Sequence, residues 1–257
     1  MSWAPVYIVG AGRVGGALAA GLARAGVELR GLWTRTAAEA ELARAVTGLP
    51  CHHGPFPADV AAARTVIVSV LDRHVATVAG ALLDAGLLRG AGAVLHCGGA
   101  APAEDALRPL VHTTVDAPGG AGAVVPVGTL HPLMAVASAE QAAARIGRAC
   151  FAVEGEPRAR EAAAWLAGAL GARWFVLGAR QMALYHAAAV LASNHAVGLW
   201  HVAQELLGRL QVPPEALQTL LDSTLDNVRE AGLPEALTGP VRRGDAATIQ
   251  RHLDVLE

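Results

Sequence analysis

The sequence has 257 residues, enough for one large domain or two modest ones. Hydrophobic residues make up 53% and charged residues 16%, a composition typical of a folded globular chain and not of a disordered one. The formal net charge of −2 gives no basic footprint for nucleic acid, and polar residues interrupt the most apolar long segment, 182–200, so we expect neither a nucleic-acid partner nor a membrane span.

The cysteines and the N-terminus point to an intracellular setting. Cys51, Cys97 and Cys150 are too few and too scattered for a disulfide framework or a zinc site. A strand-like run begins almost at the first residue and leaves no room for a signal peptide. We therefore expect a cytoplasmic protein without a metal site.

Lysine does not occur in the sequence, so all 20 Lys-plus-Arg side chains are arginine. This absence excludes Schiff-base catalysis, a P-loop lysine and the Tyr–Lys pair of short-chain reductases.

Strands and helices alternate along the first part of the chain. After a strand, turn and helix over 6–26, the pattern predicts strands at 27–33, 48–53, 65–70 and 93–99, with helices at 37–46 and 73–89. The segment 117–136 is expected to be a glycine-rich loop that leads into a strand ending at His131-Pro132. After it, the pattern predicts a strand at 149–155, a helix at 157–171 and a strand at 172–178.

This rhythm favours an α/β fold with a doubly wound, mostly parallel sheet of the Rossmann type. From Gln181 the pattern is helical, with breaks at Pro213-Pro214, Pro234 and Gly239-Pro240. We predict a nucleotide-binding domain at 1–178 and a smaller all-α domain at 179–257 for substrate binding and dimerisation.

A glycine turn follows the first strand and opens the first helix, as a dinucleotide-binding fingerprint requires. Gly10 permits the tight turn, Gly12 lets the backbone approach a pyrophosphate, and Gly15 allows the helix to pack closely on the strand. Arg13 and Val14 begin the helix, whose N-terminus would face the phosphates. The alternative is a structural turn without a ligand.

An arginine takes the place where an NAD-binding protein carries an acid. The second strand ends in Thr34-Arg35-Thr36, with no Asp or Glu for the ribose 2′-hydroxyl. A guanidinium there can pair with a 2′-phosphate, and the two threonine hydroxyls can add hydrogen bonds. The sequence therefore predicts NADP(H) as cofactor, unless Arg35 is only a solvated residue at the start of a helix.

The loop after the strand at 65–70 is expected beside the ribose and nicotinamide. Ser69 or Asp72 could contact the cofactor there, although Asp72 could equally be the N-cap of the next helix.

Hydride transfer to a carbonyl or imine needs a proton donor near the acceptor. His131 and His96 both stand at strand ends, where each could instead be a core or capping histidine. The helix over 183–197 adds two rows of polar residues: His186 with Asn194, and Tyr185 with Ser193. These could line a site or pair within an interface.

Near the C-terminus, Arg242 or Arg243 could bind a substrate carboxylate, and Asp245 is expected to cap the last helix.

Five motifs carry a family resemblance over nearly the whole chain: VGAGRVGGALA, LHCGGA, LHPLMAV, YHAAAVLASN and LTGPVRRGDAATIQRHL. Together they resemble the family that joins a Rossmann-like domain to a domain of unknown function, DUF2520. That family is similar to pyrroline-5-carboxylate reductase, 6-phosphogluconate dehydrogenase and F420-dependent NADP oxidoreductases. Some members are regarded as alternative ketopantoate reductases.

The resemblance implies an NADP-binding domain and a helical, usually dimeric C-terminal domain, with the active site between them. The β-hydroxyacid dehydrogenases use a catalytic lysine that this sequence lacks, so His131, Tyr185, His186 and Asn194 occupy the motif positions that would have to replace it. We expect an NADPH-dependent reductase of a small carbonyl or imine, such as a 2-keto acid. The alternative is a non-catalytic NADP-binding redox sensor or interaction protein.

Overall fold

The computed structural model describes residues 2–116 and 122–256, so part of the predicted glycine-rich loop, 117–121, lies outside the described residues. The chain divides into two compact units, Met1–Leu191 and Ala192–Glu257. This division falls later than the boundary expected at 178, which stays a prediction.

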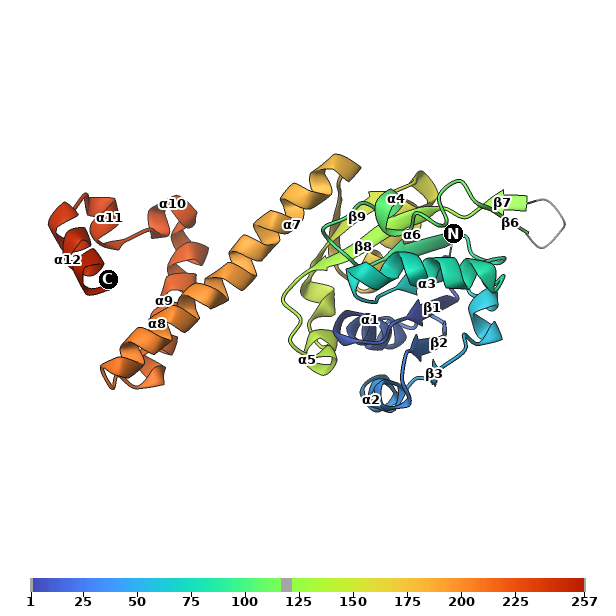
Figure 1. Ribbon diagram of the computed structural model, residues 1–257, viewed down its shortest axis with the longest axis horizontal. Helices are drawn as coiled ribbons and strands as arrows, with labels where there is room; N and C mark the ends of the chain where they lie inside the picture. Colours follow the sequence, from blue (N-terminus) through green and yellow to red (C-terminus); the bar gives the residue numbers. More distant parts are fainter. Residues whose placement is uncertain (1, 117–121, 257) are drawn as a thin grey trace. The chain divides into compact units, whose positions relative to one another are not determined.

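The first unit is built on an eight-stranded sheet of order β10-β9-β8-β5-β4-β1-β2-β3, with helices on both faces (Figure 1). Six neighbouring strands of this sheet run parallel to one another: β3, β2, β1, β4, β5 and β8. Strand β9 is antiparallel to β8, and β10 runs parallel to β9. The predicted doubly wound, mostly parallel sheet is confirmed. The strands are β1 Val6–Val9, β2 Leu29–Thr34, β3 Cys51–His53, β4 Thr65–Val68, β5 Ala93–His96, β8 Val127–Leu133, β9 Cys150–Gly155 and β10 Arg173–Val176, with β6 Thr114–Asp116 and β7 Gly122–Val124 forming a separate antiparallel pair.

The helices of this unit connect consecutive strands or follow the last one. They are α1 Arg13–Arg24, α2 Ala37–Thr47, α3 Asp72–Asp84, α4 Ala103–Ala106, α5 Ala139–Ala143, α6 Pro157–Ala169 and α7 Met182–Val190, with 3₁₀ turns at Ala58–Ala62, Ile146–Arg148 and Ala179–Gln181.

The side chains of successive residues in the buried strands pack into two separate hydrophobic cores, because they alternate between the two faces of the sheet. Leu95 and Leu130 pack with Leu166 of α6 on one face. Val94 and Val127 pack with Leu107, just after α4, on the other. Since β5 and β8 are parallel neighbours, their carboxyl ends reach the same edge of the sheet as the end of β1. That edge is where ligands bind in open α/β sheets.

The second unit is helical: α8 Ala196–Arg209, α9 Pro214–Ala231, α10 Leu233–Ala236, α11 Gly239–Arg243 and α12 Ala246–Leu256. The predicted breaks at the prolines are confirmed. Asp245 precedes α12 and accepts the Thr248 N–H at 3.1 Å and its hydroxyl at 2.8 Å, so the predicted cap is confirmed as well. These hydrogen bonds lower the pKa of Asp245.

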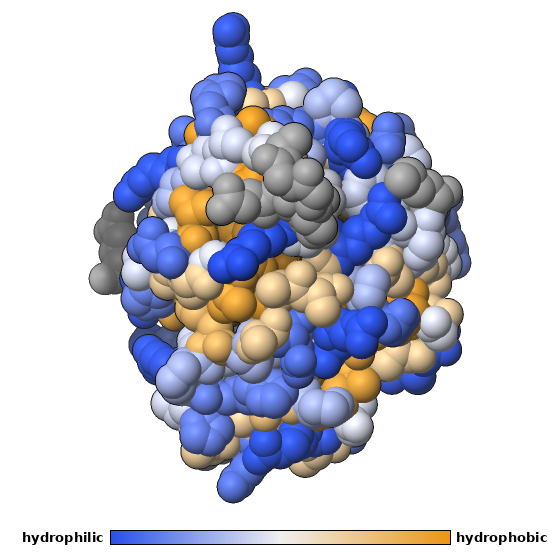
Figure 2. All heavy atoms as spheres, turned by 90° about the vertical axis from the view of Figure 1, so that its right-hand side faces the viewer, coloured by the Kyte–Doolittle hydropathy of each residue, from blue (hydrophilic) through white to orange (hydrophobic). Residues whose placement is uncertain are grey.

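The helix expected over 183–197 is not regular. Leu191–His195 form a π-helical turn between α7 and α8, which changes the register of the polar rows beyond it. The face drawn in Figure 2 mixes hydrophilic side chains with scattered apolar patches, as folded proteins usually do.

Candidate cofactor and active site

The turn after β1 has the close approaches that the glycine fingerprint predicts. Gly10 adopts φ +98°, and a Cβ on it would overlap the carbonyl oxygen of Ser69. A Cβ on Gly15 would overlap the carbonyl oxygen of Gly10, because α1 packs directly on the turn. Only glycine fits at either place.

The start of α1 is free for an anion. A Cβ on Gly12 would meet nothing within 4 Å, so open space borders the backbone at the helix N-terminus. Gly12 provides no side-chain cap, and no acidic residue lies in the first turn, where Arg13 is exposed. Unpaired N–H groups and the helix dipole favour a phosphate at such an end. These residues therefore fit a dinucleotide.

At the end of β2, the three residues expected to hold a 2′-phosphate differ in exposure and in hydrogen bonding. The Arg35 side chain is 76% exposed and lies 4.0 Å from Glu39, so its guanidinium can reach a ligand. Thr36 caps α2 in a capping box with Glu39, which leaves its hydroxyl hydrogen free to donate. Thr34 is buried and donates to the Thr36 carbonyl oxygen, so the geometry favours Arg35 and Thr36 over Thr34.

The loops after β4 and β5 meet at the same edge. Ser69 packs against Gly10 and Gly15, close to the glycine turn. The N-cap of α3 is Leu71, so the N-cap alternative for Asp72 is wrong: Asp72 is already the first helical residue. Its Oδ1 lies 2.7 Å from the place of a Cβ on Gly98, so Asp72 faces the loop after β5.

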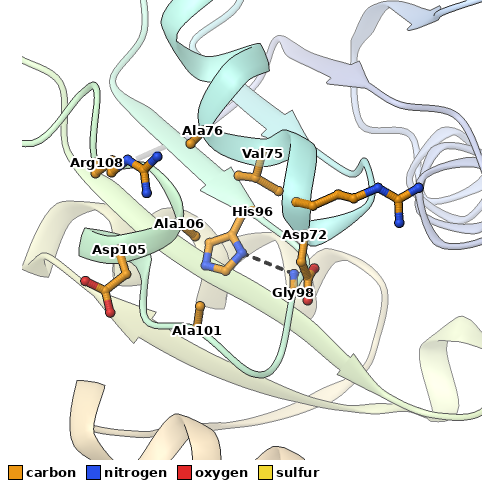
Figure 3. Close-up of a pocket in the computed structure, with 10 residues that line it drawn as sticks. Asp72, Val75, Ala76, His96, Gly98, Ala101, Asp105, Ala106 and Arg108 are labelled. Atoms are coloured by element: carbon orange, nitrogen blue, oxygen red, sulfur yellow. Dashed lines mark hydrogen bonds between the residues drawn. The ribbon is translucent and has the colours of Figure 1, made fainter.

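A pocket of about 210 Å³ opens beside Gly98, between α3 and the region of α4 (Figure 3). Asp72 and Arg73 line it from α3, and Asp105 and Arg108 from the opposite side, with His96 at its floor. Charges of both signs thus surround a small space.

His131 and Tyr185 meet in the first unit. The Nδ1 atom of His131 lies 2.8 Å from the Tyr185 hydroxyl, at hydrogen-bond distance. The Tyr185 ring is held edge-on by His131 and by Phe175, with ring centroids 5.5 Å and 5.8 Å away. His131 is on β8 and Tyr185 on α7, so the pair joins the sheet to the last helix of this unit.

Gly99 packs against this pair and His186. A Cβ on Gly99 would lie 2.7 Å from Nε2 of His131 and 2.8 Å from Cδ2 of His186. The centroids of the two imidazole rings are 6.0 Å apart. Gly99 is therefore the residue that lets the loop after β5 approach both histidines.

Burial sets the protonation states of the pair. It lowers the pKa of His131 to about 4, with His186 adding to the effect, and it raises the pKa of Tyr185 to about 12. At pH 7 the imidazole is neutral and the phenol is protonated. A neutral imidazole at pH 7 disfavours His131 itself as the acid, and its role in the reaction stays a prediction.

His96 is fully buried and belongs to a chain of hydrogen bonds. Its Nδ1 accepts the Gly98 N–H at 3.2 Å, so Nε2 carries the ring proton and donates to the Thr129 hydroxyl at 2.8 Å. Thr129 in turn donates to Glu154 at 3.1 Å. Burial, and secondarily His131, lower the pKa of His96 to about 4.

Three of the expected side chains belong to the second unit: Asn194, Arg242 and Arg243. Asn194 is exposed and belongs to the second unit. Arg242 donates to the carbonyl oxygens of Pro234, Glu235 and Leu237 at 3.0–3.2 Å, so it holds α10 and α11 together instead of presenting a free guanidinium. Arg243 is exposed.

Sequence reasoning missed Gly99, Thr129 and Glu154. Glu154 carried a signal, since it interrupts a strand that is otherwise apolar, whereas Thr129 shares its strand with His131. Within the described ranges, no three His, Cys, Asp or Glu side chains cluster as metal ligands do, and no helix is long and apolar enough to cross a membrane.

Family profiles match both parts of the chain. Residues 3–117 match a Rossmann-like domain, and residues 149–257 match DUF2520, a domain of unknown function. Comparison with curated proteins gives no match.

Solved structures share the fold across nearly the whole chain. A proposed NADP oxidoreductase of Bacteroides fragilis superposes with a TM-score of 0.74 at 23% identity, covering 98% of this chain and 90% of that one. The NADP-bound pyrroline carboxylate reductase of Plasmodium falciparum gives 0.60 at 10% identity, with 98% and 91% covered. The imine reductase of Myxococcus stipitatus in complex with NADP⁺ gives 0.61 at 19% identity, with 99% and 78% covered. At these identities the likeness establishes the fold.

Proposed function

Since the chain joins a Rossmann-like domain to a DUF2520 domain, we propose that it is an oxidoreductase that uses NADPH to reduce a small carbonyl or imine substrate. The observation that carries this proposal is the hydrogen-bonded pair of His131 and Tyr185 at the carboxyl end of β8, the same sheet edge as the free N-terminus of α1. Structural neighbours that bind NADP and reduce imines or pyrroline carboxylate support it.

The cofactor is held by the glycine turn and by the end of β2. Gly10, Gly12 and Gly15 admit the pyrophosphate to the N-terminus of α1, and Arg35 with Thr36 binds the 2′-phosphate. Ser69, which packs against the glycine turn, and Asp72, which faces Gly98, would border the nicotinamide half. When bound, NADPH supplies a hydride to the acceptor carbon.

Tyr185 supplies the proton. In the tautomer of His131 with hydrogen on Nδ1, the ring donates to the Tyr185 oxygen, which leaves the tyrosine O–H free to face the acceptor. As negative charge develops on the acceptor oxygen or nitrogen, the O–H bond breaks and the proton moves to that atom. The His131 hydrogen bond then stabilises the phenolate, and the imidazole remains neutral throughout.

A small carboxylate, such as a 2-keto acid of the ketopantoate kind, fits the size and charge of the pocket beside Gly98. Its volume of about 210 Å³ suits a small molecule, and Arg73 and Arg108 line it together with Asp72 and Asp105. A guanidinium binds a carboxylate in a bidentate manner. His186 and Asn194 stay candidates for orienting the acceptor.

We also propose a cytoplasmic homodimer. All fourteen residues of α8 are described and none of them is buried. The apolar side chains of Val197, Leu199 and Val202 are each more than half exposed to water. A second copy would remove these side chains from water.

The proposal is tested with a panel of 2-keto acids and cyclic imines, by following NADPH absorbance and subtracting its acceptor-independent consumption. Acceptor-dependent oxidation that is reduced in Tyr185→Phe is the expected result. If NADPH binds but no acceptor accelerates its oxidation, the protein is instead a non-catalytic NADP-binding module.

A further inference from the structure

A row of buried polar side chains crosses three strands of the sheet. His96 on β5, Thr129 on β8 and Glu154 on β9 are direct cross-strand partners, and their exposed fractions are 1%, 0% and 5%. Their neighbours along each strand are apolar, so the row places three polar side chains within an otherwise apolar core. Buried polar groups are stable only when they are hydrogen-bonded, and this row satisfies that condition.

The row reaches the loop 97–102 at both of its ends. At one end, the Gly98 N–H donates to Nδ1 of His96 at 3.2 Å (Figure 3). At the other, the N–H of Ala103, the first residue of α4, donates to Oε2 of Glu154 at 2.8 Å. Thr129 links the two anchors, because its hydroxyl accepts from His96 and donates to Glu154.

This loop carries Gly99, whose backbone lies against Nε2 of His131 and the ring of His186. A shift of the loop would therefore change the space beside His131 and Tyr185. Catalytic geometry tolerates little displacement, and misplacement by about 1 Å can cost on the order of a hundredfold in rate.

We propose that His96, Thr129 and Glu154 are positioning residues that clamp both ends of the loop 97–102 and hold Gly99 against the His131–Tyr185 pair. His96 also lines the pocket beside Gly98, whereas Thr129 and Glu154 do not, so Thr129 and Glu154 act only through the loop. Its role in the reaction rests on the proposed reductase function, whereas the clamp itself does not. The low pKa of His96 agrees with the clamp, because protonation of Nδ1 would remove the acceptor of the Gly98 N–H.

The test is Thr129→Val, which keeps the shape of the side chain but removes the hydroxyl, with Thr129→Ser as the matched variant that restores it. Backbone amide exchange of the whole protein, measured by NMR, reports the clamp without any turnover. We expect the Gly98 amide to exchange at least about tenfold faster in Thr129→Val and to recover in Thr129→Ser, while the amide of Ile67 in β4 keeps its rate. An equal acceleration of Gly98 and Ile67 would mean that the row only stabilises the core, and would overturn the proposal.

A second pair of variants covers the case in which Thr129→Val fails to fold. Asparagine at position 96 places an acceptor near the Nδ1 position, whereas glutamine reaches toward the Nε2 position. His96→Asn should protect the Gly98 amide better than His96→Gln does. Equal protection in both variants would contradict the clamp.

Kinetics then connect the clamp to the reaction. In Thr129→Val we expect kcat for the acceptor to fall at least about tenfold, with less than a threefold change in NADPH affinity. A mobile loop with unchanged kcat would overturn the positioning role. If the wild-type protein reduces no acceptor, the reductase proposal fails, and amide exchange still decides whether the clamp exists.

Discussion

The two compact units differ in how much of each is buried. The first encloses a sheet between two apolar cores, with Phe151, Leu95 and Tyr7 fully removed from water. In the second, Leu217 is the one buried side chain among residues 192–256, and large apolar side chains remain exposed along its helices. A unit with so little burial cannot supply its own stability. The comparison indicates that the first unit provides the rigid frame of the site, and that the second depends on contacts outside itself.

Truncation of one core side chain in each unit gives the largest expected effect. Phe151→Ala should lower the free energy of unfolding by about 3–5 kcal/mol, because it leaves a cavity in a packed core. Leu217→Ala, with its side chain 8% exposed and few buried neighbours, should cost at most about 2 kcal/mol. Urea denaturation at one fixed protein concentration measures both. Equal losses would mean that the units do not differ as described.

A charge on α8 tests whether a second copy covers the exposed apolar side chains. Leu199 is 72% exposed, so Leu199→Glu should leave the fold of one chain intact. In a homodimer it would bury a carboxylate and weaken association at least about a hundredfold. Analytical ultracentrifugation should show a dimer for the wild type and for Leu199→Met, and a monomer for Leu199→Glu. A monomeric wild type would show the dimer prediction to be wrong.

The two tyrosines of the chain provide a matched test of the proton donor. Tyr185→Phe should lower kcat about a hundredfold, with little change in NADPH affinity, because the O–H that donates to the acceptor is gone. Tyr7→Phe removes a buried hydroxyl that donates to the Leu32 carbonyl oxygen, so it should reduce stability and leave kcat nearly unchanged. Equal rates for Tyr185→Phe and the wild type would exclude Tyr185 as the acid.

The pH dependence of kcat distinguishes a tyrosine acid from a histidinium acid. With a pKa of about 4 for His131 and about 12 for Tyr185, both groups stay neutral from pH 6 to 9, so kcat should be flat there. A change in kcat is expected only as the pH drops toward 4, where His131 gains a second ring proton. A histidinium acid with an ordinary pKa would instead lose rate above about pH 6.5.

The free energy of unfolding should depend on pH through His96 and His131. The pKa values of His96 and His131 are lowered to about 4, so the unfolded chain binds more protons than the folded one between about pH 6.5 and 4. Their contribution is fully present above that window and is lost as the pH falls through it.

Local sequence patterns were sufficient to predict the fold class and the glycine turn after β1. The glycine turn and the cap at Asp245 depend on residues close in sequence, and both lie where the pattern predicts, whereas Thr34 is buried. The roles of these residues toward a cofactor stay predictions. The family resemblance is confirmed by the two matching domains.

The other features of the site could not be predicted, because they depend on contacts between residues far apart in the sequence. Thr129 meets His96 and Glu154 only because β5, β8 and β9 are neighbours in the sheet, and nothing local specifies that order or the reversal of β9. The π-helical turn at Leu191–His195 was equally unforeseen, since the sequence there keeps an ordinary helical composition. The partial burial of His131, which lowers its pKa, depends on the packing of α7 and of the loop that carries Gly99.

Direct titration of NADPH and NADH against the wild type, Arg35→Ala and Arg30→Ala tests the central claim, that the first unit is an NADP(H) site. Arg30 lies on β2, the strand that ends just before Arg35, and pairs with Glu28 at 3.1 Å, so its variant controls for loss of charge. We expect NADPH to bind at least about tenfold more tightly than NADH, a difference of roughly 1.4 kcal/mol, and we expect only Arg35→Ala to abolish that preference. Failure of both nucleotides to bind the wild type would reduce the glycine turn to a structural feature and contradict the proposed function.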